Sequence, residues 1–159
     1  MNTLERHLPP TTTRVEENTS GELNLRIERK TEEVVLRVAC EGRDAIARRL
    51  DELDREWDIE RTLEANAAIV SLITLALGYF MNPWWYAFTA VVVVFLLQHA
   101  VQGWCPPVPI FRRRGIRTER VINMERTALR ILRGDFRSTA DPREALAQAR
   151  AGHSENISQ

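Results

Sequence analysis

The sequence has one long stretch that lacks charge. Between Glu64 and Arg112 there is no Asp, Glu, Lys or Arg, which leaves 47 consecutive residues without these side chains. A soluble domain needs such residues across its surface, so this absence argues against an ordinary soluble fold. A bilayer core about 30 Å thick needs roughly 20 apolar residues per helix. The stretch is therefore long enough for two membrane crossings and a tight turn.

Other absences exclude whole classes of protein. Two cysteines, Cys40 and Cys105, are too few for a disulfide framework, and we expect both to be reduced thiols. The sequence contains no phosphate-cradling glycine-rich loop, no Ser/His/Asp constellation and no paired carboxylates in apolar surroundings. The apolar run begins after 64 mostly polar residues, unlike a secretory signal. We therefore expect no enzymatic activity, no cofactor and no metal.

The charge-free stretch divides into two predicted crossings. The first covers residues 63–81 and the second covers residues 84–104, with the turn signal Asn82-Pro83 between them. The proline-rich segment after Trp104 ends the second crossing. Trp84, Trp85 and Trp104 fall at predicted helix ends, which is the depth that amphipathic aromatic rings prefer. Residues 63–111 are thus predicted to form a transmembrane hairpin with a proline-rich exit.

The distribution of arginine predicts the orientation of the hairpin. Arginines precede the first crossing and follow the second, whereas the hairpin tip has none. The positive-inside rule then predicts a multi-pass membrane protein with both termini in the cytoplasm. Residues 1–64 carry a balance of −5 and residues 112–159 a balance of +5. Because the two flanks share a compartment, they are expected to attract one another.

Helical patterns predict that both flanks are amphipathic helices, so the fold class is an all-α membrane protein. Residues 1–21 read as a mobile leader, and residues 22–62 as two helices that meet at Gly42. Leu23, Ile27, Val34 and Val38 share one face, although alternation at residues 23–27 leaves a strand open. The second helix carries a stripe of Ile46, Leu50, Leu53 and Trp57. It either continues into the first crossing or bends near Trp57.

The C-terminal flank, residues 112–151, is predicted to hold two more helices. Thr118 is a candidate cap for a helix that ends at Arg133, with Gly134 as its stop. Val121, Ile122, Leu129 and Leu132 make that helix amphipathic. Asp141-Pro142 opens a short last helix, and residues 152–159 are predicted to be a disordered tail.

Several segments resemble a known family. Ala65-Asn66 opens the first crossing, and Leu97-Gln98-His99-Ala100-Val101-Gln102-Gly103-Trp104-Cys105-Pro106 closes the second. Together with residues 114–118 and 132–136, these segments resemble the YgaP-like transmembrane domain of small bacterial inner-membrane proteins, generally of unknown function. A relative that joins this domain to a rhodanese sulfurtransferase is a dimer, so the resemblance implies self-association. The rhodanese part has no counterpart here, and its activity is not carried over.

Cys105 is the candidate reactive thiol of the sequence. The positive charge of Arg112–Arg114 would favour its thiolate, whereas the negative end of the preceding helix opposes it. The alternative is a small residue that packs where the helix breaks.

Gln98, His99 and Gln102 form a candidate intramembrane polar site in the last two turns of the second crossing. Polar side chains at that depth need partners, so hydrogen bonding between helices is favoured over a conducting role. A metal site of His99 and Cys105 lacks the further ligands that it would need.

Two further sets of residues have predicted structural roles. Thr74 and Gly78 form a small-xxx-small pair, which packs the hairpin or a second copy of the chain. Arg112, Arg113, Arg114 and Arg117 are predicted to orient the hairpin and to contact lipid headgroups rather than nucleic acid.

The sequence supports two hypotheses about function. The first is a non-enzymatic membrane anchor or scaffold that self-associates, as a homodimer or higher oligomer, or recruits a cytoplasmic protein. The second is a subunit of an oligomeric channel or of a thiol-linked small-anion transport system that uses Cys105 and His99.

Overall fold

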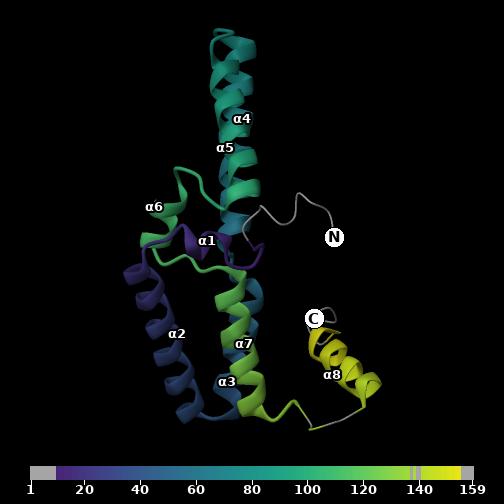
Figure 1. The fold of residues 1–159 in the computed structure, drawn as a ribbon. Coiled ribbons are helices and arrows are strands. Elements are labelled where there is room, and N and C mark those ends of the chain that lie inside the picture. Colours follow the sequence, from purple (N-terminus) through teal and green to yellow (C-terminus); the bar gives the residue numbers. More distant parts are fainter. Residues whose placement is uncertain (1–9, 137, 139–140, 155–159) are drawn as a thin grey trace. The chain divides into compact units, whose positions relative to one another are not determined.

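The computed structural model describes residues 10–136, 138 and 141–154, with side chains as far as residue 149. Within these residues the chain forms α-helices joined by turns, and no strand (Figure 1). The all-helical prediction is therefore confirmed for this part of the chain. The segment Leu23–Ile27, for which a strand was the alternative, lies inside a helix.

The described residues form two compact units. In chain order the described helices are α1 (Arg14–Glu17), α2 (Gly21–Glu41), α3 (Arg43–Arg55), α4 (Ile59–Phe80), α5 (Trp85–Gln102), α6 (Val108–Arg113), α7 (Glu119–Arg133) and α8 (Pro142–Ser154). The first unit contains the described residues up to Glu28 together with Trp57–Val121. The second contains Arg29–Glu56 and the described residues from Ile122 onward. Helices α2 and α7 each contribute to both units, and the two units are described separately below.

In the first unit, α4 and α5 lie side by side along their length (Figure 1). The hydroxyl groups of Thr74 and Thr89 are 2.7 Å apart across this helix pair. Asn82 forms the connection, where its side-chain oxygen accepts a hydrogen bond of 2.9 Å from the backbone N–H of Trp84. The turn therefore falls where Asn82-Pro83 predicted it. The helices begin and end within about four residues of the predicted crossings, which is ordinary uncertainty for helix ends.

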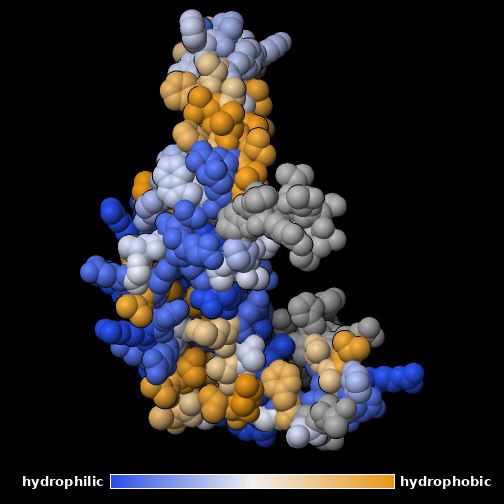
Figure 2. All heavy atoms as spheres, viewed as in Figure 1, coloured by the Kyte–Doolittle hydropathy of each residue, from blue (hydrophilic) through white to orange (hydrophobic). Residues whose placement is uncertain are grey.

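The outer surface of this helix pair is apolar and exposed. Helices α4 and α5 are the two described segments that are long and apolar enough to cross a membrane. Only 17% of the most apolar stretch of 18 residues within Arg43–Phe80 is buried, and only 6% of α5. The core helix of a soluble protein, in contrast, is mostly buried. Figure 2 shows hydrophobic residues over the middle of this helix pair on the face in view. Their large exposed side chains include Ile69, Leu72, Ile73, Phe88, Val91, Val94, Phe95 and Leu97.

A compact core lies at the other end of the helix pair, where α4 begins and α5 ends. Its buried residues are Val15, Ile59, Leu63, Cys105 and Val108, with Phe111 and Ile116 packed against them. Val15 belongs to α1, so the prediction that residues 1–21 form a mobile leader is wrong for the described part of that segment. Burial of Val15 and the hydrogen bonds made by its neighbours fix α1 in place. Residues 1–9 lie outside the described residues.

A break separates α3 from α4 at residues 56–58. Asp58 caps α4, because its side chain accepts a hydrogen bond of 2.8 Å from the backbone N–H of Arg61. Trp57 lies in the break, 49% exposed, with the Arg61 guanidinium 4.4 Å above its ring. Of the two arrangements left open by the sequence, the chain takes the one in which the second helix stops near Trp57. Trp57 therefore does not join the stripe predicted for α3.

The second unit has its own hydrophobic core. Its buried residues are Val38, Ala45, Ile46, Leu50, Leu53, Ile122 and Leu129, with Val34 and Val35 packed against them. Residues from α2, α3 and α7 thus contribute, so the two flanks of the chain meet within this unit. Leu132 does not take part, contrary to the predicted stripe, because it is 53% exposed at the end of α7.

The helix ends in this unit follow the turn residues of the sequence. Gly42 and Gly134 have φ values of 98° and 86°, a left-handed region that glycine adopts without steric strain. Asp141 precedes α8, and its side chain accepts a hydrogen bond of 2.9 Å from the backbone N–H of Arg143. Helix α8 continues to Ser154, so the predicted disordered tail of residues 152–159 is wrong for its first three residues. Residues 155–159 lie outside the described residues.

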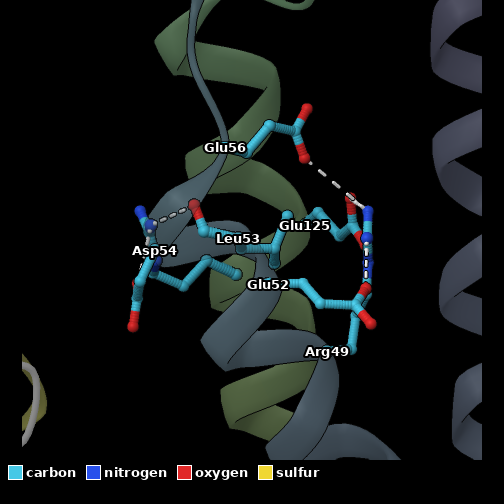
Figure 3. A network of polar contacts seen from close by, with 7 residues as sticks. Arg49, Glu52, Leu53, Asp54, Glu56 and Glu125 are labelled. Carbon is cyan, nitrogen blue, oxygen red and sulfur yellow. Dashed lines mark hydrogen bonds and ion pairs between the residues drawn. The ribbon is translucent and has the colours of Figure 1, made fainter.

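A charged network crosses from α3 to α7 in the second unit (Figure 3). The Glu125 side chain has no exposed surface, and it accepts hydrogen bonds from Arg49 of 2.7 Å at Nε and 3.3 Å at an η nitrogen. Arg49 also pairs with Glu52 at 2.8 Å and Glu56 at 3.8 Å. The hydrogen bond to Glu125 raises the pKa of Arg49. This pair joins the two flanks, although its acidic member comes from the basic flank.

Candidate functional site

The candidate site lies in the first unit, at the point where α4 begins and α5 ends. The start of α4 is fixed by its cap and by a backbone hydrogen bond of 2.9 Å from Ile59 N–H to the carbonyl of Arg117. Ile59 itself is completely buried. The next residue, Glu60, is therefore held in a defined position, with a side chain that is one-third exposed.

His99 meets Glu60 from the last turns of α5. The imidazole Nε2 lies 2.8 Å from a carboxylate oxygen of Glu60, and His99 is only 3% exposed. A carboxylate accepts hydrogen bonds, so this contact places a proton on Nε2. The other ring nitrogen, Nδ1, is buried and has no hydrogen-bond partner among the described residues. In a neutral ring, Nδ1 is then the atom that can accept a proton.

Helix α1 covers this pair. One η nitrogen of Arg14 donates to the second carboxylate oxygen of Glu60 at 3.1 Å, and the other donates to the carbonyl of Ala100 at 3.2 Å. The amide of Asn18 donates to the carbonyl of Gln102 at 2.9 Å. Gly103 permits this approach, because a Cβ atom there would lie 2.7 Å from the Arg14 backbone. Gly103 also has a φ of 74°, which favours glycine.

The charge of Glu60 is stabilised by these neighbours. Glu60 precedes the first predicted crossing. Its hydrogen bond with His99 lowers the pKa of Glu60 below the ordinary value of 4.5, burial opposes this effect, and Arg14 adds to it. The carboxylate therefore stays ionised at neutral pH and can hold the imidazole in one orientation.

Cys105 follows α5 and is also buried. It is 5% exposed. Its surroundings are apolar, with Val15, Ile59, Leu63 and Val108 in the same cluster. Cys105 and His99 are thus both buried in the first unit, and the contact that the structure records for the imidazole is the one with Glu60.

The predicted intramembrane polar site is only partly assembled. His99 is buried, but Gln98 is half-buried and Gln102 is exposed. The described partner of His99 is Glu60 rather than either glutamine. Glu60 was not predicted as the partner of His99 because it belongs to the charged flank, 39 residues away in the chain. One signal was available, since a histidine in an apolar helix needs a polar partner, and Glu60 and Glu64 are the last acidic residues before the charge-free stretch.

The four arginines predicted to contact headgroups fall into two pairs. Arg113 and Arg114 are exposed, as that role requires. Arg112 is 1% exposed and donates to the carbonyl of Ile116 at 3.1 Å and to the side chain of Asn24 at 2.7 Å. Burial lowers the pKa of Arg112. Arg117 is 8% exposed. The prediction that Arg112 and Arg117 contact headgroups is therefore wrong for this conformation, because both side chains lie inside the fold.

Thr74 and Gly78 pack α4 against α5. Thr74 is 5% exposed, and its hydroxyl contacts Thr89. A Cβ atom at Gly78 would lie 2.5 Å from a ring carbon of Tyr86, so a side chain there meets the facing helix. Of the two predicted uses of this motif, the structure places it within one chain. The predicted cap, Thr118, precedes α7, and its hydroxyl donates to Glu16 of α1 at 2.7 Å.

The described residues contain no group of three or more His, Cys, Asp or Glu side chains that could hold a metal ion. Comparison of the chain with protein-family models, with curated proteins and with solved structures finds no match.

Proposed function

We propose that this protein is a membrane anchor in which α4 and α5 cross the bilayer as a hairpin. The exposed apolar surface of the two helices supports this proposal most directly. In water, so many large apolar side chains on one helix pair would be strongly unfavourable. In a bilayer they face lipid, and the backbone polar groups of both helices are satisfied internally.

The residues at the two ends of the helix pair fit this orientation. Trp84 is 79% exposed beside the turn, where an indole ring would sit at the level of the headgroups. The exposed arginines Arg113 and Arg114 follow the opposite end. By the positive-inside rule, that end and both flanks face the cytoplasm of a bacterial inner membrane.

The second unit is the part proposed to act as a scaffold. Its core of α2, α3 and α7 residues is separate from the apolar helix pair, and it leaves Leu36, Ile131 and Leu132 more than half exposed. Such side chains are available for a second copy of the chain or for a cytoplasmic protein. The resemblance to the YgaP-like domain also favours self-association. The described residues give no specific support to the channel or transport alternative, because His99 is already paired within the chain.

Membrane insertion can be tested with Val94, which is 61% exposed near the middle of the second predicted crossing. An arginine at the centre of a membrane helix costs about 2.5–3.5 kcal/mol in insertion assays. We expect Val94→Arg to increase the fraction of the chain that alkaline washing removes from membranes. The matched control, Val94→Ala, should remain in the membrane fraction. Equal extraction of both variants would contradict the proposal.

Self-association is tested separately by crosslinking the full chain in membranes through residues of the second unit. Crosslinked dimers that disappear after Leu36→Glu, but persist after substitution of an exposed polar residue of the same helix, would support a scaffold that assembles with itself. A strict monomer would leave recruitment of another protein as the proposed role.

A further inference from the structure

We propose that the carboxylate of Glu16 occupies a binding site for a phosphate group, and that the headgroups of anionic phospholipids displace it and thereby release α1. The preference for phosphate follows from the contacts of Glu16 within the first unit. Only the source of the phosphate, a lipid headgroup, rests on the proposed membrane anchor.

Glu16 lies on α1, and donors from the segment where α7 begins hold its carboxylate. One oxygen accepts a hydrogen bond of 2.7 Å from the hydroxyl of Thr118. The other accepts a hydrogen bond of 2.7 Å from Nε of Arg120 and lies 2.7 Å from an η nitrogen of the same guanidinium. The Glu16 side chain is 11% exposed, and Thr118 is buried. A hydroxyl and a guanidinium thus hold the two oxygens of one anion.

A phosphodiester suits the same donors. Its two unesterified oxygens share one negative charge, as the two oxygens of a carboxylate do, and the arginine fork binds both kinds of anion in the same way. The Arg120 side chain is 44% exposed, so an anion can reach it from outside the fold. Arg120 also lies 3.8 Å from Glu28, but that carboxylate is 46% exposed, and such a pair contributes little.

A second guanidinium makes the neighbourhood of Glu16 more positive. The amide of Asn24 donates to the backbone carbonyl of Glu16 at 2.9 Å, and its oxygen accepts a hydrogen bond of 2.7 Å from Arg112. Arg112 is buried, its other recorded acceptor is a backbone carbonyl, and its Nε has no partner among the described residues. A buried cation whose hydrogen-bond partners are neutral favours an anion nearby. That preference persists if the carboxylate of Glu16 moves away.

Helix α1 is the part that would move. It has four residues, too few for a helix to be stable by itself. Apart from Glu16, it is held by buried Val15 and by Arg14 and Asn18, which both donate to carbonyl groups in the last turns of α5. That end of α5 is the cytoplasmic end of the second predicted crossing. If α5 spans the bilayer, headgroup phosphates lie at the level of α1 and can compete with Glu16.

The test measures the protection of α1 against hydrogen exchange in the full chain by mass spectrometry. The chain is placed in vesicles of phosphatidylcholine, or of equal parts of phosphatidylcholine and phosphatidylglycerol. Loss of one partly exposed ion pair corresponds to a change of about fivefold, so we expect protection about fivefold lower with phosphatidylglycerol. Arg120→Gln should abolish this difference. The matched control Arg113→Gln removes an exposed arginine that does not contact α1, and it should retain the difference.

A second arm replaces vesicles with neutral detergent micelles and adds inorganic phosphate, with chloride at equal ionic strength as the reference. Lower protection of α1 with inorganic phosphate, absent in Arg120→Gln, would support the phosphate site even if the membrane anchor proves wrong. A response to phosphatidylglycerol alone would support a site that takes the phosphate from lipid. A response to inorganic phosphate alone would overturn the lipid source.

Glu16→Gln keeps the test decisive if Arg120→Gln alters the fold. It preserves the shape of the side chain and removes the charge that competes with phosphate. We expect α1 to be about fivefold less protected in phosphatidylcholine already, with a smaller further change in phosphatidylglycerol. Equal protection of α1 in the unmodified protein under all conditions would overturn the proposal. So would a lipid effect that persists in Arg120→Gln, one that disappears in Arg113→Gln, or unchanged protection in Glu16→Gln.

Discussion

The buried carboxylate of Glu125 allows a quantitative prediction about the second unit. Arg49 supplies two hydrogen bonds to this carboxylate (Figure 3), and the Glu125 side chain has no exposed surface. Replacing Arg49 with methionine keeps much of the aliphatic stem and removes the charge. The carboxylate of Glu125 then stays buried without its main counter-charge, which is far less favourable than an intact pair.

The size of the effect follows from the burial of the two partners. Breaking a buried ion pair by removing one member costs about 3–5 kcal/mol. Arg49 is 21% exposed, so solvent screens part of the interaction, and we expect the lower end, about 3 kcal/mol. Since about 1.4 kcal/mol corresponds to a factor of ten, the opening equilibrium of α3 and α7 should increase about 150-fold.

Hydrogen exchange measured by mass spectrometry on the full chain in micelles is the suitable assay. It reports the opening free energy of individual helices. The protein's tryptophans and tyrosines lie in the first unit or its helix pair, so fluorescence would not report on the second. Peptides from α3 and α7 should exchange faster in Arg49→Met, while peptides from α4 and α5 should not change.

Arg126 provides the matched control. It pairs with Asp54 at 2.9 Å, and its exposure of 22% matches that of Arg49, but Asp54 is 23% exposed whereas Glu125 has no exposed surface. Because the carboxylate left behind in Arg126→Met can be solvated, we expect a cost of at most about 1 kcal/mol and a change in exchange of no more than about fivefold. Adding Glu125→Leu to Arg49→Met should recover most of the loss, because the buried carboxylate that lost its Arg49 counter-charge is gone. An effect of Arg49→Met no larger than that of Arg126→Met would refute this reasoning.

Two more predictions concern the first unit. Because the folded-state pKa of Glu60 is lowered, its contribution to stability is present above pH 4.5 and is lost as the pH falls below that value. The protection of α1 against hydrogen exchange, corrected for the intrinsic exchange rate at each pH, should therefore fall below pH 4.5 in the unmodified protein and depend less on pH in Glu60→Gln, whereas equal pH dependence would contradict this assignment. Gly78→Ala should weaken the α4–α5 contact by about 1–3 kcal/mol through its clash with Tyr86, and the double variant Gly78→Ala/Tyr86→Ala should relieve that clash. Gly21→Ala, where a Cβ atom has open space, is the control, and equal exchange of α4 and α5 in the two single variants would count against the packing role.

The local features of the fold could be predicted from the sequence. Gly42 and Gly134 end helices because few other residues adopt their backbone angles, and Asn82-Pro83 marks the turn between α4 and α5. The absence of charge between Glu64 and Arg112 located the two apolar helices. These features depend on neighbouring residues, so a pattern along the chain is sufficient to find them.

The long-range contacts could not be predicted in the same way. The polar contact of Glu60 with His99 joins residues 39 positions apart, and that of Arg49 with Glu125 joins residues 76 positions apart. Helix α1 was not predicted, because four residues are too few to show the periodicity of a helix. Its position also depends on a long-range contact, in which Arg14 meets the end of α5. The burial of Arg112 was hidden by its two arginine neighbours, which are exposed as a basic cluster usually is.

The most direct test of the proposed membrane hairpin is the side of the membrane on which the tip and the flank are found. Asn82→Cys in a background without native cysteines marks the tip, and the exposed native Cys40 in Cys105→Ser marks the second unit. Both are treated with a thiol reagent that does not cross membranes, in spheroplasts and in inverted vesicles. The hairpin predicts that Asn82→Cys reacts only in spheroplasts and Cys40 only in inverted vesicles. Reaction of both cysteines from the same side would contradict it.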